Sequence, residues 1–142
     1  MEFHHIPVLL AQCMEALSIQ PDGIYLDGTV GGAGHSKEIA ARLQTGRLIC
    51  LDQYPDAVAT ARERLAGLPA TVIQENFRNT AAVLDGAGVT GLNGALLDLG
   101  VSSHQLDETA RGFSYQGDAP LDMRMSQAGP TAADLVNGLS RE

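Results

Sequence analysis

The stretch IYLDGTVGGAGHSKEIAARL at residues 24–43 decides the fold class. It opens with a short apolar run ending in Asp27, continues through the glycine-rich residues 28–34, and then has helical spacing through Ile39 and Leu43. Glycine permits positive φ and lets backbone amides and a helix N-terminus approach a ligand closely. This order of strand, glycine-rich turn and helix predicts a βα unit with a ligand at the turn. The spacing G-x-x-G-G-x-G is not G-x-G-x-x-G, so a plain tight turn is the alternative.

Strand and helix patterns alternate on both sides of this stretch. Short apolar runs between turn residues predict strands at 24–27, 47–52, 70–74 and 94–99. Three-to-four spacing and terminating residues predict helices at 7–18, 35–43, 55–67, 81–84 and 131–135. Strands alternating with helices of about ten residues predict βαβ units in a parallel sheet, hence an α/β fold. Residues 100–130 lack such periodicity, and we expect an ordered functional loop there.

The composition is that of a single folded domain. The chain has 142 residues, of which 44% are apolar and 18% charged, so it can bury one core and is not a disordered chain. No apolar run approaches the roughly 18 residues of a membrane helix, and the start MEFHHIPVLL lacks a signal peptide's basic region. We therefore expect a cytoplasmic protein without a membrane partner. The lone Cys13 and Cys50 have neither metal nor redox spacing, and no metal site is indicated.

Charge restricts the possible partners. The net charge of −8 repels a phosphate backbone, so a nucleic-acid partner would have to be held mainly by something other than this chain.

Aspartates stand at the carboxyl ends of three predicted strands. These are Asp27, Asp52 and Asp98. Ligands of open α/β sheets bind outside the carboxyl ends of the strands, so we expect all three carboxylates to line that edge. Asp52 lies 21 residues beyond Gly31, where an acid accepts hydrogen bonds from both ribose hydroxyls of an adenosine. Phe77, just after the third strand, is a candidate for holding the adenine by its face, with core packing as the alternative.

Both NAD and S-adenosylmethionine contain that adenosine. Asp98 ends the fourth predicted strand, beside the place where the reactive group of the cofactor would sit. A carboxylate there suits a sulfonium cation and its ammonium group, whereas it would repel a pyrophosphate. The sequence thus favours S-adenosylmethionine, and an NAD-dependent oxidoreductase domain is the less favoured alternative.

Five segments closely resemble the RsmH (MraW) family: HIPVLL (5–10), DGTVGGAGHS (27–36), LDLGVSSHQLD (97–107), RGFSY (111–115) and PLDMRM (120–125). Members are S-adenosylmethionine-dependent methyltransferases that modify N4 of a cytidine in 16S ribosomal RNA of the small subunit. The resemblance implies the Rossmann-like parallel sheet of the class I S-adenosylmethionine-dependent methyltransferases. It places cofactor contacts on Ala33, Gly34, His35, Asp52, Phe77, Asp98 and Gln105. The family usually reads FGRGGHS where this chain has VGGAGHS, so Gly32 and Ala33 replace an arginine and a glycine.

The resemblance covers only the N-terminal part of the longer family members. Residues 1–142 are therefore expected to form the N-terminal part of the methyltransferase domain, truncated after the fourth strand, without the family's helical insertion and C-terminal strands. The expected partner of the parent protein is 16S rRNA or the small ribosomal subunit. The alternative is an incomplete, inactive fragment that only binds S-adenosylmethionine or self-associates, as a homodimer, through its exposed sheet edge.

The acceptor chemistry suggests roles for a few further residues. The exocyclic amine of cytosine is a poor nucleophile, and a carboxylate that accepts its proton helps the attack on the methyl group. Asp98 is the candidate catalytic residue. Phe113 or Tyr115 would give the target base a stacking face, with loop packing as the alternative for both. Asp122 and Arg124 would either contact RNA or pair with each other.

Overall fold

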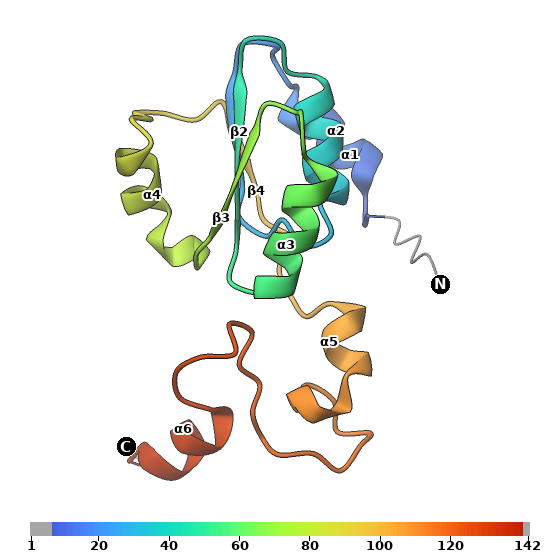
Figure 1. Cartoon of the computed structure of the whole chain (residues 1–142), viewed down its shortest axis with the longest axis vertical. Coiled ribbons are helices and arrows are strands. Elements are labelled where there is room, and N and C mark those ends of the chain that lie inside the picture. Colours follow the sequence, from blue (N-terminus) through green and yellow to red (C-terminus); the bar gives the residue numbers. More distant parts are fainter. Residues whose placement is uncertain (1–6, 141–142) are drawn as a thin grey trace. The chain divides into compact units, whose positions relative to one another are not determined.

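A computed structural model describes residues 7–140 and contains a four-stranded parallel sheet (Figure 1). The strands are β1 (Ile24–Asp27), β2 (Arg47–Asp52), β3 (Ala70–Gln74) and β4 (Gly94–Leu96). They lie in the order β3-β2-β1-β4, and every pairing is parallel. Because all the strands run the same way, their carboxyl ends meet at one side of the sheet, which we call the carboxyl edge. The predicted α/β class with a parallel sheet is confirmed.

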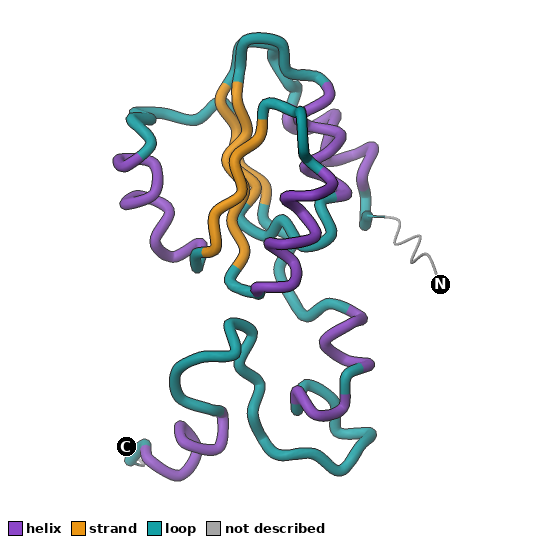
Figure 2. Tube along the Cα trace, viewed as in Figure 1, coloured by secondary structure: helices purple, strands orange, loops and turns teal. Residues whose placement is uncertain are grey.

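Helices and 3-10 turns precede, separate and follow the strands along the described chain. They are α1 (Leu10–Leu17), α2 (Gly34–Ala41), α3 (Pro55–Arg64), α4 (Thr80–Gly86), α5 (Ser103–Asp107) and α6 (Ala132–Gly138), with 3-10 turns η1 (Phe77–Asn79) and η2 (Thr109–Arg111). Figure 2 shows the strands enclosed between α4 on one side and α1 to α3 on the other.

Two hydrophobic clusters hold these layers together. The central strands β1 and β2 are apolar on both faces, as expected for parallel strands covered on each side. On one face Tyr25, Leu48 and Cys50 pack with Met14, Ile39 and Ala61 of α1, α2 and α3. On the other face Leu26, Ile49 and Leu51 pack with Val83 and Leu84 of α4. This packing fixes β1 and β2 rigidly, and with them the start and the anchor of the glycine-rich loop.

Most helix boundaries and one strand boundary differ from the sequence expectation. The first helix begins at Leu10 and not at Pro7, because Leu9 has a left-handed φ of 51° that cannot belong to the helix. The fourth strand ends at Leu96 and not at residue 99, because β1 turns away after Asp27 and leaves the following residues without a neighbouring strand. Helix α4 is longer at both ends, and the expected loop at 100–130 contains α5 and η2.

The chain divides into two compact units, one ending at Asp98 and the other beginning at Leu99. The first holds the whole sheet and α1 to α4. In the second, the Met123 amide donates to the Arg111 carbonyl at 3.0 Å, and the Arg111 guanidinium lies 5.7 Å from the centre of the Phe113 ring. Each unit thus has internal contacts of its own. The expectation that residues 1–142 form one N-terminal part of a methyltransferase domain stays a prediction.

Candidate functional site

The glycine-rich loop after β1 is fastened to the end of β2. The Val30 amide donates to the Leu51 carbonyl, and the Gly31 amide donates to Oδ2 of Asp52, both at 2.9 Å. Gly31 and Ala33 have left-handed φ values of 48° and 63°, which turn the chain sharply into α2. Only glycine adopts this region readily, so Ala33 is held there by its surroundings. The loop is therefore a fixed turn that aims the N-terminus of α2 toward the carboxyl edge.

Asp52 is the polar centre of this arrangement. Its side chain is half-buried, with Oδ2 accepting from Gly31 and Oδ1 accepting from the Tyr54 amide at 2.9 Å. A carboxylate oxygen has two lone pairs, so each oxygen keeps one acceptor position beyond its backbone donor. Two open positions side by side match the two neighbouring hydroxyls of a ribose. The residues present thus fit an adenosine-containing cofactor.

Phe77 stands at the carboxyl edge next to the loop. It opens η1 and its side chain is 39% exposed, so the core-packing alternative does not describe it. A Cβ built on Gly28 would lie 3.2 Å from the Phe77 Cβ and 2.5 Å from the Leu97 Cδ2. Gly28 therefore lets side chains from two neighbouring chain segments close on the start of the loop. An exposed aromatic face beside Asp52's strand end is suitably placed for a flat, uncharged ring.

Asp98 lies beyond β4, and its side chain is exposed. Its backbone amide donates to the Thr29 hydroxyl at 2.7 Å, which attaches the residue to the glycine-rich loop. The structure thus brings the loop residues Ala33 and Gly34 together with Asp52, Phe77 and Asp98 to the same edge of the first unit, although the Ala33 side chain is buried in the core.

Asp27 does not line the edge as the sequence analysis expected. Its side chain is buried, with 1% exposed, and accepts hydrogen bonds from the Ser36 hydroxyl at 2.6 Å and the Thr29 amide at 3.1 Å. The reason is that Ser36 in the first turn of α2 draws the carboxylate inward. Asp27 thereby bridges the start of the loop and the helix that follows it. Sequence reasoning missed this supporting role, because the sequence carries no signal that tells an aspartate facing the core from one facing a ligand.

The titration of Asp27 gives a testable pH dependence. Burial raises the pKa of the Asp27 carboxyl above 3.8, although the hydrogen bonds from Ser36 and Thr29 oppose this. An acid with a raised folded-state pKa binds more protons folded than unfolded just above pH 3.8. Its contribution to stability therefore falls as the pH rises through that window, and stays lowered above the folded-state pKa.

We expect Asp27→Asn to remove this loss of stability with rising pH. The effect is measured by urea unfolding of both proteins at a series of pH values from 4 to 7, with the difference in their free energies of unfolding plotted against pH. The expected size of the effect is about 1.4 kcal/mol for each unit by which the pKa is raised. Subtraction cancels the other groups, including Asp122. Parallel curves for the two proteins would contradict the assignment.

His35 and Gln105 are placed differently from the other predicted contacts. The His35 ring is buried with Nε2 2.9 Å from the Val8 carbonyl, so the ring holds the chain before α1 and only the backbone of His35 faces the turn. Gln105 is buried in α5, in the second unit, where its Oε1 accepts from the Ser102 amide at 3.0 Å. Its contact with a cofactor stays a prediction.

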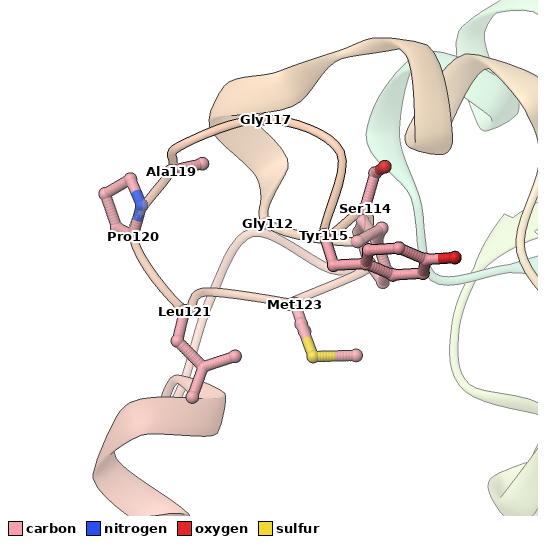
Figure 3. A pocket seen from close by; sticks show the side chains of 9 residues that line it. Gly112, Ser114, Tyr115, Gly117, Ala119, Pro120, Leu121 and Met123 are labelled. Atoms are coloured by element: carbon pink, nitrogen blue, oxygen red, sulfur yellow. The ribbon is translucent and has the colours of Figure 1, made fainter.

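The second unit contains the four residues that the acceptor chemistry singled out for RNA contact or base stacking. Arg124 pairs with Asp122 at 2.7 Å, and the hydrogen bonds that its side chain and its backbone amide donate to Asp122 lower the pKa of that carboxyl to about 2. Residues of the 112–123 segment, including Tyr115 and Met123, line an open hollow of about 310 Å³, and Figure 3 shows their side chains. Tyr115 is 98% exposed, whereas Phe113 is half-buried beneath Arg111. Of the two candidates for base stacking, Tyr115 is therefore the one whose ring is exposed, whereas the Phe113 ring is covered by Arg111.

The described residues give no indication of other kinds of site. Within residues 7–140, no three or more His, Cys, Asp or Glu side chains converge as metal ligands. In the same range, none of the helices has the length and apolar character needed to cross a membrane. Both cysteines are free thiols, and burial raises the pKa of the Cys50 thiol to about 12.

The order of the parallel strands, the glycine-rich loop after β1 and the acid ending β2 form a Rossmann-like sheet, which is the fold of the class I S-adenosylmethionine-dependent methyltransferases. Solved structures share it. The C-terminal domain of precorrin-6Y C5,15-methyltransferase from Rhodobacter capsulatus matches with a TM-score of 0.52 and 18% identity over 70% of this chain and 52% of that chain. A SAM-dependent methyltransferase from Agrobacterium tumefaciens matches with a TM-score of 0.52 and 17% identity over 68% of this chain and 33% of that chain.

Within that class, the chain belongs to the MraW methylase family, whose sequence profile matches residues 2–142. The ribosomal RNA small subunit methyltransferase H of Finegoldia magna is 51% identical over all of this chain and 46% of its own length. The protein of the same name from Heliobacterium modesticaldum is 55% identical over 96% of this chain and 45% of its own length. The chain thus spans about half the length of these curated relatives. The family does not support the oxidoreductase alternative.

Proposed function

We propose that this chain is the cofactor-binding part of an S-adenosylmethionine-dependent methyltransferase that acts on N4 of a cytidine in 16S ribosomal RNA. The observation that carries the proposal is Asp52: a carboxylate fixed to the glycine-rich loop at the carboxyl edge, with one open acceptor position on each oxygen. The names of the curated relatives supply the RNA substrate.

The proposed binding mode follows the chemistry of each side chain. Asp52 accepts both ribose hydroxyls, and the exposed face of Phe77 contacts the adenine. The first amides of α2, at Gly34 and His35, have no acceptor within the helix and point toward the ligand's polar groups. Asp98 faces the positive charges of the methionine part, and Gln105 is the contact proposed from the second unit.

S-adenosylmethionine, when bound, supplies a methyl group on a positively charged sulfur. The chain's own task is then to orient the amine that accepts it. The lone pair of the cytosine amine is delocalised into the ring, so an acceptor for an N–H hydrogen localises that pair. The exposed carboxylate of Asp98 is the proposed acceptor, which makes it the proposed catalytic residue.

Charge indicates how the RNA is held. The net charge of −8 disfavours contact with phosphates, so the remainder of the parent protein is proposed to grip the 16S rRNA or the small ribosomal subunit. A second proposal concerns this chain without the rest of the parent protein. It binds the cofactor without catalysing methyl transfer, or it pairs with a second copy of itself. The observation favouring it is that β4 lies at the end of the sheet and pairs, in the part of the chain that is described, with β1 alone.

Calorimetric titration with S-adenosylmethionine and with NAD tests the first proposal. We expect binding of S-adenosylmethionine and no detectable binding of NAD. Transfer of a labelled methyl group to 16S rRNA, assayed with this chain alone and with a full-length relative, then separates an active unit from one that only binds. Binding of NAD in place of S-adenosylmethionine would overturn both proposals, and elution as a dimer in size-exclusion chromatography would support self-association.

A further inference from the structure

We propose that Thr29 is a positioning residue, which fixes Asp98 at the cofactor through a hydrogen bond to its backbone. The inference rests on the proposed function, because it takes Asp98 as the partner of the cofactor's positive charges. Nothing in the sequence patterns singled out Thr29, which lies between Gly28 and the sharp turn at Gly31.

The strand register explains why Thr29 is needed. Strands β1 and β4 pair Leu26 with Ala95 and Asp27 with Leu96, and the Gly28 amide donates to the Leu96 carbonyl at 3.0 Å. If the same register continued, Thr29 would stand opposite Asp98. The backbone of β1 has turned into the loop by then and offers Asp98 no ladder partner. The Thr29 hydroxyl accepts from the Asp98 amide at 2.7 Å and so replaces the missing backbone acceptor.

Thr29 is itself held from the buried side. Its amide donates to Oδ1 of Asp27, while Oδ2 of the same carboxylate accepts from Ser36 in α2. Asp27 is buried in the first unit, so it gives Thr29 a rigid support. The backbone that carries the exposed Asp98 carboxylate is therefore connected to the core through two hydrogen bonds, from the Asp98 amide to the Thr29 hydroxyl and from the Thr29 amide to Asp27.

Substitutions at Thr29 separate this role from general packing. Thr29→Val keeps the branched shape and removes the acceptor, whereas Thr29→Ser keeps the hydroxyl. Loss of one hydrogen bond corresponds to an affinity change of about three- to tenfold. The loss should appear only for ligands that carry the positive charges facing Asp98. The matched control is Thr90→Val, since Thr90 is exposed and precedes β4 at the amino end of the strands.

The test is calorimetric titration of each full-chain variant with S-adenosylmethionine and with 5′-methylthioadenosine, which keeps the adenosine but has neither positive charge. We expect Thr29→Val to weaken binding of S-adenosylmethionine about three- to tenfold and to leave 5′-methylthioadenosine within about twofold. Thr29→Ser and Thr90→Val should stay within about twofold of the unsubstituted chain for both ligands. Added to Asp98→Asn, Thr29→Val should have little further effect, because it acts through Asp98.

Three results would overturn the proposal. They are equal weakening of both ligands by Thr29→Val, full additivity with Asp98→Asn, or a loss in Thr29→Ser as large as in Thr29→Val. Circular dichroism checks that each variant folds, and Thr29→Ala replaces the valine variant if that one does not. An unsubstituted chain that binds neither ligand would instead refute the proposed function, so the two failures are distinguishable.

Discussion

Asp52→Asn should weaken binding of S-adenosylmethionine at least about a hundredfold, because hydrogen bonds to a charged group contribute about 1.5–3 kcal/mol each and two are lost or impaired. Asparagine offers a single acceptor oxygen. Its amide group would also face either the Gly31 or the Tyr54 amide, which sets donor against donor where the carboxylate now accepts from both. The substitution therefore removes ligand acceptors and loosens the loop at the same time. Calorimetry measures the affinity directly.

Asp56→Asn is the control for Asp52→Asn. Asp56 is an exposed carboxylate in the first turn of α3, four residues further along the chain. Its loss changes the net charge by the same amount but should leave the affinity within about twofold. If Asp56→Asn weakened binding as strongly, or Asp52→Asn bound normally, Asp52 would not be the ribose acceptor and the proposed binding mode would be wrong.

The sequence predicts the central part of the sheet well. Strands β1, β2 and β3 have the predicted bounds, because each is a short apolar run between turn residues and is covered on at least one face. The end of β4 was missed because Leu97 and Leu99 continue the apolar pattern while β1 has already turned away. A strand ends where the neighbouring strand no longer pairs with it. For β4 that neighbour is β1, which lies almost seventy residues earlier in the chain.

The candidate site was also predictable only where local sequence spacing determines it. The spacing of Gly31 and Asp52 predicted that both belong to one adenosine site, and the structure joins the two residues by a hydrogen bond, while the ribose contact itself stays a prediction. Asp27 shows the limit. A strand-ending aspartate reads the same in sequence whether it faces a ligand or the core, and the choice is made by Ser36 in the next helix. Thr29 was missed because its partner Asp98 becomes a neighbour only once the sheet has formed.

Gly46→Ala should lower the free energy of unfolding by about 3 kcal/mol or more. A Cβ at Gly46 would lie 2.2 Å from the Gly23 carbonyl oxygen and 2.9 Å from the Asp22 carbonyl carbon. Both are backbone atoms that a side-chain rotation cannot move. The Gly23 carbonyl also accepts from the Arg47 amide at 3.1 Å, next to the first β1–β2 pair. The substitution therefore forces apart the amino ends of the two central strands. Urea unfolding of Gly46→Ala and of Gly91→Ala, where a Cβ meets nothing within 4 Å, measures the cost.

The two largest effects should fall on different measurements, and that contrast locates the site. Gly46 lies at the amino end of β2 and Asp52 at its carboxyl end. Under conditions where Gly46→Ala remains folded, its affinity for S-adenosylmethionine should therefore stay within about twofold, while its stability is lowered. Asp52→Asn should show the reverse, with affinity lost and only a modest change in stability. A folded Gly46→Ala protein that had lost its affinity would show that binding depends on the amino ends of the strands, and a Gly46→Ala protein of unchanged stability would show that the close approach to Gly23 is relieved at little cost.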